Sequence, residues 1–375
     1  MLKKILRCIT LLILCSCSVL EKSHADSMIV KDVTPTVYPH QESAAFPVST
    51  VESLASIQSI TVSLECSTYW ETNWGTGNNQ LGYNSKVEGN PGSFFPPVFD
   101  ESGNIYIADR FNHRILVFAG GEEIRSISTP STWPQEGADD MGKRWSNLVV
   151  QRESLYLRFS EWVENRVIDK LGIFTFDDQH WKIIDLAPYY PHHSILAQTI
   201  TANGSGGVYI RLDPGLVYFD AQHYLELIYP GLTADETLLL GWDKNLYLYA
   251  YHSDKLTGWS EQRRPFIDLT QPTFEMYGVF SFLGQRSANQ LPLHRQFLGA
   301  DVYGQIYLSH SRSDVQTPWI ISRLLPDERM LIGEIPPYIL SAFTKLSLAP
   351  DGRVYGMTYD PEDISILPRI IQCHF

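Results

Sequence analysis

The chain has 375 residues, of which 44% are hydrophobic, 12% aromatic and 19% charged. This apolar content is ample for a large core, and aromatic residues together with many glycines and prolines favour β-structure with frequent turns. The formal net charge is -13. An acidic surface repels phosphate backbones, so the composition argues against a nucleic-acid-binding protein.

The N-terminus has the pattern of an export signal. Lys3, Lys4 and Arg7 form a basic region, and a short apolar run from Ile9 to Leu14 follows it. The run is too short to span a bilayer with these flanks, which is typical of a signal peptide rather than of a transmembrane helix. The protein is therefore predicted to be exported.

Two cleavage sites compete at the end of this signal. Leu14-Cys15-Ser16-Cys17 resembles a bacterial lipobox, in which the last cysteine is lipidated. It predicts a lipoprotein-type signal peptide over residues 1–17, lipidation of Cys17 and a cell-envelope protein held on the membrane by its lipid anchor. Ser23-His24-Ala25 ends in a small residue, as ordinary signal peptidase prefers, and predicts a secreted protein instead.

Composition separates a tether from a folded domain. Residues 18–59 contain Ser, Thr, Pro and scattered charges with little periodicity, so we interpret them as a flexible tether. The folded domain is predicted over residues 60–375. Processing at Cys17 would leave Cys66 and Cys373, and an oxidising compartment favours a disulfide between two such cysteines.

An aliphatic–Tyr pair recurs six times along the folded domain. Four of the six tyrosines have a glycine three residues before them, and a short apolar run precedes most of these turns. Each unit is therefore interpreted as a strand, a turn, a second strand that carries the pair, and further strands. The pairs are Ile105-Tyr106, Leu155-Tyr156, Val208-Tyr209, Leu246-Tyr247, Ile306-Tyr307 and Val354-Tyr355.

The length of the repeat indicates a propeller. Four-stranded units of about 40–50 residues are typical of propeller blades. A lone blade would leave both of its faces in water, whereas blades packed face to face around an axis bury them. Residues 60–375 fit six such units, so the predicted fold is all-β: a six-bladed β-propeller closed by N- and C-terminal strands.

The first unit resembles an NHL repeat. Over residues 97–118 the resemblance depends on Asp109, on Asn112-His113-Arg114-Ile115 and on Phe118. The other five units keep the strand spacing without the Asn-His-Arg signature. The resemblance implies a six-bladed propeller of the NHL type.

In many propellers of this kind an N-terminal strand completes the last blade. The alternating segment Ile60–Glu65 and the apolar segment Ile364–Cys373 are the candidates here. Their pairing would lay Cys66 beside Cys373, and a disulfide would then hold the ring closed.

Candidate ligand-binding residues come from aligning the units on the Tyr of each pair. Propellers bind ligands at the mouth of the central channel, where the innermost strands begin. The position eleven residues before each Tyr is occupied by mixed polar and aromatic residues, which suit a small polar or sugar-like ligand. The alternative is that they merely solvate the ends of the channel. The candidates are Trp145, Gln198, Glu236, Gln296 and Thr344, with Arg295 beside Gln296; Phe95 is the sixth aligned position.

Two classes of function remain open. Lactonase-type propellers hold a divalent metal with Glu, Asn and Asp, and amidating lyases with NHL-like repeats use His ligands. Here the aligned positions offer one acid, Glu236, and the histidines are scattered among the units, so no metal, cofactor or catalytic residue is predicted. The first interpretation is a binding module for a protein partner or a small polar ligand. The alternative is a metal-dependent hydrolase or lyase.

Overall fold

A computed structural model describes much of the folded domain. The described residues are 59–83, 96–130, 144–163, 166–186, 200–202, 208–212, 215–219, 225–230, 236–250, 255–259, 265–268, 293–312, 319–325, 329–335, 345–359 and 365–375. All of them belong to one compact unit of the chain. The predicted cleavage sites and most of the predicted tether lie outside the described residues.

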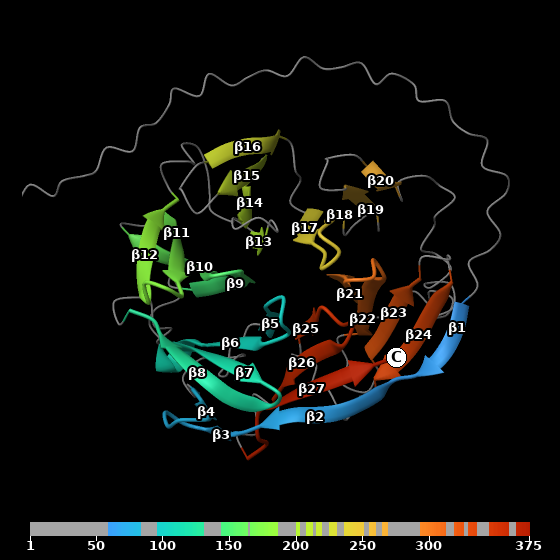
Figure 1. Cartoon of the computed structure of the whole chain (residues 1–375), viewed down its shortest axis with the longest axis horizontal. Helices are drawn as coiled ribbons and strands as arrows, with labels where there is room; N and C mark the ends of the chain where they lie inside the picture. Colours follow the sequence, from blue (N-terminus) through green and yellow to red (C-terminus); the bar gives the residue numbers. More distant parts are fainter. Residues whose placement is uncertain are drawn as a thin grey trace, which may run out of the picture. The chain divides into compact units, whose positions relative to one another are not determined.

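The described residues are all-β, as predicted, and hold a single short 3₁₀ helix, η1 (Arg110–Asn112). Within these ranges no helix has the length and apolar character needed to cross a membrane. Six sheets of four or five strands follow one another along the chain, numbered sheets 1 to 6 below (Figure 1).

Sheets 1 to 3 cover the first half of the domain. Sheet 1 contains β5 (Val98–Phe99), β6 (Ile105–Asp109), β7 (Arg114–Ala119) and β8 (Glu122–Ser128). Sheet 2 contains β9 (Arg144–Gln151), β10 (Ser154–Val163), β11 (Arg166–Thr175) and β12 (His180–Asp185). Sheet 3 contains β13 (Ile200–Ala202), β14 (Val208–Leu212), β15 (Gly215–Phe219) and β16 (Leu225–Pro230).

Sheets 4 to 6 cover the second half. Sheet 4 contains β17 (Glu236–Leu240), β18 (Leu246–Ala250), β19 (Lys255–Trp259) and β20 (Pro265–Asp268). Sheet 5 contains β21 (Leu293–Ala300), β22 (Ile306–Arg312), β23 (Trp319–Leu324) and β24 (Met330–Ile335). Sheet 6 contains β25 (Lys345–Leu348), β26 (Val354–Thr358) and β27 (Arg369–His374). Ahead of them lie β1 (Ser59–Ser63), β2 (Glu65–Glu71), β3 (Asn73–Trp74) and β4 (Gln80–Leu81).

Within each sheet the strands given above for it form an antiparallel meander, in which each strand pairs with the next along the chain, and β1 and β2 add to sheets 5 and 6. The six aliphatic–Tyr pairs lie in β6, β10, β14, β18, β22 and β26, the second strand of each sheet. The predicted position of the repeat is therefore confirmed. The arrangement of the sheets as six blades of a closed ring stays a prediction.

In sheets 1, 4 and 5 the repeat tyrosine ties the second strand to the preceding turn. In sheet 1 the Asp100 carboxylate accepts hydrogen bonds from the backbone N–H groups of Ser102 and Asn104, both at 2.9 Å. The Tyr106 hydroxyl donates to the same carboxylate at 3.2 Å. The same bond joins Tyr247 to Asp243 at 2.7 Å and Tyr307 to Asp301 at 3.1 Å. A short turn with a bonded carboxylate thus sets the register of the first two strands.

Neighbouring sheets pack face to face. Ile115 of sheet 1 and Leu157 of sheet 2 are buried in one cluster, and Ile321 of sheet 5 and Leu346 of sheet 6 in another. A third cluster joins sheet 1 to sheet 6 through residues such as Ile107. Burying each such side chain contributes about 1.5–3 kcal/mol. The first strands also contact in sequence, from β5 to β9, β13, β17, β21 and β25.

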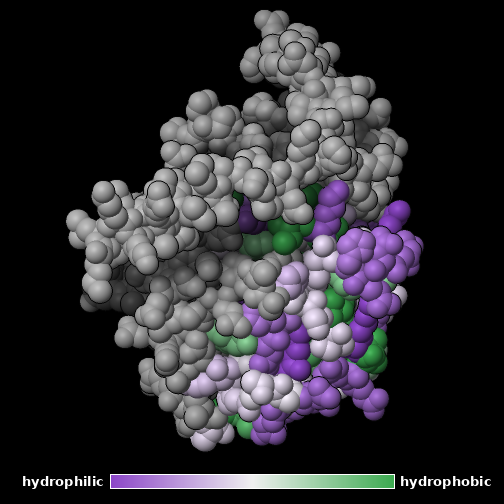
Figure 2. All heavy atoms as spheres, turned by 90° about the vertical axis from the view of Figure 1, so that its left-hand side faces the viewer, coloured by the Kyte–Doolittle hydropathy of each residue, from purple (hydrophilic) through white to green (hydrophobic). Residues whose placement is uncertain are grey.

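The outward side of the sheets is mainly hydrophilic. In β8 exposed and less exposed residues alternate, and Ile127 is the buried one. Figure 2 shows the side that carries β12, where the described residues are mostly hydrophilic with hydrophobic ones between them. This alternation is expected for a strand with one face on the core and one in water.

The N-terminal strands correct one expectation. The segment Ile60–Glu65 was predicted to complete the last sheet, but β1 pairs in parallel with β24 and becomes the fifth strand of sheet 5. The next strand, β2, completes sheet 6 by pairing antiparallel with β27 (Figure 1). Leu64 between them packs on Gly333, where a β-carbon would lie 2.3 Å from the Leu64 Cγ. Because Gly333 has no side chain, Leu64 can pack against β24, and this part of the chain lies on sheet 5.

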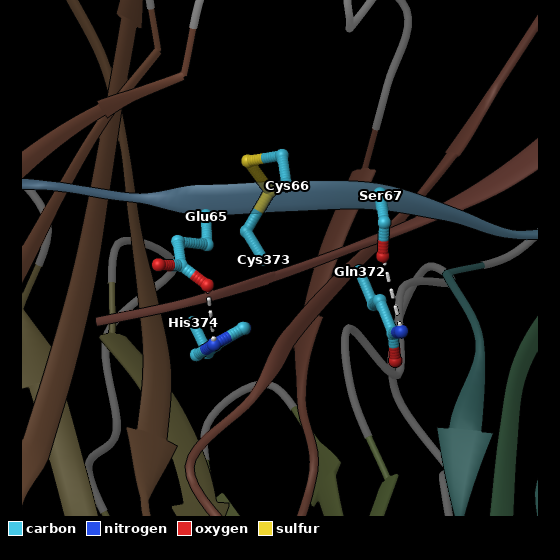
Figure 3. The surroundings of a disulfide bond; sticks show 6 residues. All are labelled: Glu65, Cys66, Ser67, Gln372, Cys373 and His374. Carbon is cyan, nitrogen blue, oxygen red and sulfur yellow. Dashed lines mark hydrogen bonds and ion pairs between the residues drawn. A yellow bond between two sulfur atoms is a disulfide. The ribbon is translucent and has the colours of Figure 1, made fainter.

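The predicted cysteine pair is joined. Cys66 and Cys373 lie directly opposite each other on β2 and β27, with their Cα atoms 4.2 Å apart, and form a disulfide. Figure 3 shows the cross-strand contacts on either side of it: His374 Nε2 lies 3.3 Å from a Glu65 carboxylate oxygen, and the Gln372 amide donates to Ser67 at 3.2 Å. Strand pairing and the disulfide therefore act at the same place.

Candidate functional site

The predicted ligand-binding residues fall on the first strands where the structure describes them. Trp145 lies in β9 and is 3% exposed, with its ring in the hydrophobic cluster between sheets 1 and 2. Its side chain therefore packs in the core. Gln198 and Thr344 lie outside the described residues, as does Phe95.

Gln296 ties two first strands together. It lies in β21, is half-buried, and its side-chain amide donates to the Leu346 carbonyl of β25 at 3.1 Å. Part of the hydrogen-bonding capacity of this amide thus holds sheet 5 to sheet 6. The amide also has a second donor hydrogen and an acceptor oxygen.

Glu236 and Gln296 lie on the first strands of sheets 4 and 5, β17 and β21, which contact each other. A β-carbon on Gly299 of β21 would lie 3.1 Å from the Leu239 Cδ2 of β17, so these two residues are neighbours. Arg295 precedes Gln296 in β21. Glu236 begins β17, and Arg295 and Gln296 are the third and fourth residues of β21, so all three lie in the first half of a first strand.

The other end of the first strands carries the turns, and Trp242 fills space there. This residue follows β17, yet its ring packs against the cluster of sheets 1 and 6 and against the cluster of sheets 5 and 6. Its indole N–H donates to the Leu348 carbonyl at 2.9 Å, and its backbone N–H donates to the Ala300 carbonyl at 2.8 Å. The turn of sheet 4 is thus anchored on two other sheets.

A charged contact lies beside this tryptophan. Lys244 of the sheet 4 turn forms an ion pair with Glu101 of the sheet 1 turn. Both side chains are substantially exposed, at 37% and 55%. Residues from sheets far apart in the sequence therefore meet at the turn end and cover it.

The turn carboxylates are residues that sequence reasoning missed. Asp243, Asp301 and Asp351 each precede a repeat Tyr by four or six residues, and this offset was the available signal. Their oxygens accept hydrogen bonds from their own turns, as from Asn245, Gln305 and Arg353. These acids are structural acceptors.

Burial changes the titration of the turn tyrosines. It raises the pKa of Tyr247, and the hydrogen bond to Asp243 raises it further. Burial also raises the pKa of Tyr355 to about 12. At Asp351 burial opposes ionisation, but hydrogen bonds from Arg353 outweigh it and lower the carboxyl pKa. Within the described ranges, no three His, Cys, Asp or Glu residues gather in a group that could hold a metal ion.

The NHL-like signature serves packing. Asp109 is fully buried, and its carboxylate accepts hydrogen bonds from the Gly82 N–H at 2.9 Å, from Asn112 at 2.8 Å and from Arg114 at 2.9 Å. Arg114 also donates to the Gly77 carbonyl at 2.9 Å. Burial raises the pKa of the Asp109 carboxyl. These side chains hold the N-terminal segment on sheet 1.

Comparison with known proteins yields no family. No protein-family model matches the chain, and no curated protein matches it. Among solved structures it is similar to a virginiamycin B lyase from Staphylococcus aureus, with 10% identity, a TM-score of 0.42 and coverage of 83% of this chain and 99% of that chain.

Two further structures are comparably similar. Regucalcin from Agrobacterium tumefaciens, described as a calcium-binding protein, has 12% identity and a TM-score of 0.40, covering 75% of this chain and 90% of that chain. A luciferin-regenerating enzyme has 10% identity and a TM-score of 0.44, covering 75% and 91%. TM-scores this low carry no argument about the activity of this chain.

Proposed function

We propose that residues 60–375 form a six-bladed β-propeller, with sheets 1 to 6 as its blades. The successive contacts of the first strands support a ring, because each blade of a propeller places its first strand beside that of the next. The cluster shared by sheets 1 and 6 supports closure between the first and last blades. The disulfide between β2 and β27 would hold that closure.

The propeller is a binding module for a small polar ligand. The observation that carries this proposal is the contrast between the ends of the first strands: Trp242 and the Lys244–Glu101 pair cover the turn end. The first halves of the neighbouring first strands β17 and β21 carry Glu236 and Arg295 in the sequence. Ionic and amide groups at a channel mouth give direction and specificity to a polar ligand. A protein partner in place of the small ligand stays a prediction.

The module is exported and lipid-anchored. The signal-peptide pattern over residues 1–17 and the lipobox-like Cys17 support this, and the Cys66–Cys373 disulfide suits an oxidising compartment. Metabolic labelling with a fatty-acid analogue tests it. Wild type should take up label and Cys17→Ala should not, with the variant appearing in the soluble fraction. Unlabelled wild type that begins at Asp26 would establish a secreted protein.

Ligand binding is tested with the full chain and a panel of monosaccharides, sugar acids and amino acids. A binder present at about 100 times its Kd stabilises the folded state by about 2.7 kcal/mol, which is readily seen as a rise in Tm. Glu236→Gln or Arg295→Gln should abolish the rise. The matched control is Lys244→Gln at the turn end, which should keep it.

Metal content distinguishes the binding module from the alternative of a metal-dependent hydrolase or lyase. Metal analysis of purified wild type and Glu236→Gln should find no stoichiometric divalent metal in either. Stoichiometric metal in wild type that is lost in the variant would favour the hydrolase or lyase. A rise in Tm that is lost equally in Lys244→Gln would contradict the placement of the ligand at the first-strand end.

A further inference from the structure

The segment Ser59–Gly82, called the strap below, crosses three sheets. Its strand β1 lies on the edge of sheet 5 beside β24, and β2 lies on the edge of sheet 6 beside β27 (Figure 1). Beyond β2 it reaches sheet 1, where the Gly82 N–H donates to Asp109 and the Gly77 carbonyl accepts from Arg114. One short N-terminal segment thus binds sheets 5, 6 and 1.

Side chains of the strap fit these sheets closely. The Trp70 ring lies 4.6 Å from the Phe118 ring of sheet 1, between centroids, and the Tyr69 hydroxyl accepts a hydrogen bond from the Gly121 N–H at 2.7 Å. Leu64 occupies the space that Gly333 leaves on β24. The strap is therefore a specific partner for the edges beneath it.

The strap binds two strand edges. If it left, β24 and β27 would present unpaired N–H and C=O groups, which favour pairing with another strand. The strap also precedes the rest of the domain, with residues 83–97 between it and β5. Such an element can make the same contacts on a second copy as on its own chain. Its exchange between two copies therefore costs little free energy. The disulfide ties it covalently to its own β27.

We propose that the strap is an exchangeable clasp, kept on its own chain by the Cys66–Cys373 disulfide. A dithiol reductant breaks the S–S bond, each cysteine sulfur gains a proton, and the dithiol becomes a disulfide. The released strap then pairs with β24 and β27 of a second copy, and that copy returns its own strap. A disulfide oxidant such as oxidised glutathione would then accept two electrons and two protons for each bond formed, and join Cys66 of one chain to Cys373 of the other.

Two single-cysteine variants test this exchange. Both are made in the full chain with Cys8, Cys15 and Cys17 changed to Ser, one carrying Cys66→Ser and the other Cys373→Ser, each with a different tag. Equal amounts are mixed under reduction with dithiothreitol and then reoxidised. The expected product is a covalent dimer with both tags, doubled in mass on a non-reducing gel. Each variant alone is the matched control, because its exchanged dimer would place Ser opposite Cys.

Two outcomes overturn the proposal. One is that the mixture stays monomeric, and the other is that covalent dimer forms as readily from one variant alone. Circular dichroism checks that each variant folds. If either does not, the chain that retains both Cys66 and Cys373 is prepared with each tag, unfolded under reduction, mixed, refolded and reoxidised. Disulfide-linked dimers with both tags then support the exchange, whereas monomers alone overturn it.

Discussion

The two ends of the first strands are built differently. At the turn end the polar groups are engaged: the carboxylates of Asp243 and Asp301 accept from their own turns and from a tyrosine hydroxyl. Trp242 fills the space between the sheets. Toward the opposite end, β17 begins with Glu236, and Arg295 is the third residue of β21. The described hydrogen bonds and packing thus stabilise the turn end, and the ligand site proposed above lies at the other end.

The largest expected effect comes from the tryptophan at the turn end. Trp242→Ala removes a half-buried indole that contacts three sheets, and it should lower the free energy of unfolding by about 3 kcal/mol. Urea denaturation measures the loss. Trp242→Phe is the control, because it keeps a ring and loses the N–H bond to Leu348, which costs about 1 kcal/mol. Equal losses in both variants would show that the hydrogen bond, not the packing, matters.

Gly352 tests how closely neighbouring turns fit. It has φ +84, and a β-carbon there would lie 2.5 Å from the Tyr307 hydroxyl and 3.0 Å from an Asp301 carboxylate oxygen. Gly352→Ala should lower the free energy of unfolding by about 2–3 kcal/mol. The loss combines the cost of the left-handed conformation with the clash of the new β-carbon with these two side chains. Thermal unfolding measures the change.

Gly103 provides the matched control for this glycine. Its φ is +81, but nothing lies within 4 Å of the position its β-carbon would take. Gly103→Ala should therefore lower the free energy of unfolding only by the cost of the left-handed backbone conformation, about 1–2 kcal/mol. If the two alanine variants lose the same stability, the turns of sheets 5 and 6 do not depend on close contact.

These glycines also show what could be predicted from sequence. The repeat was recognisable because its Tyr and Gly act within one turn, where residues a few positions apart meet. The sheets that the strap pairs with could not be predicted, because the alternating pattern of Ile60–Glu65 is compatible with the edge of any sheet. The choice of β24 depends on Gly333, far along the chain. The position of Trp242 likewise depends on three sheets that sequence spacing does not relate.

Alkaline pH should loosen the turn end. Burial raises the pKa of Tyr355 from 10.0 to about 12, so the folded state favours the protonated hydroxyl. The stability this contributes is fully present below pH 10 and is lost as pH rises toward 12. Tyr355→Phe should therefore lose less stability than wild type over this window, although it loses the hydrogen bond to Gln372 at neutral pH. Parallel losses in urea titrations would contradict the assignment.

The smallest effect is expected at the surface of the turn end. The Lys244–Glu101 pair is substantially exposed, and such pairs contribute about 0–1 kcal/mol and are screened by salt. Lys244→Met should lower stability slightly at low salt, and the difference should vanish in about 1 M salt. A double-mutant cycle with Glu101→Gln isolates the interaction. A loss that persists at high salt would show that the aliphatic part of Lys244 covers Trp242, because packing is not screened. The rise in Tm with the proposed ligand should remain unchanged in either case, since this pair joins the turns of sheets 4 and 1.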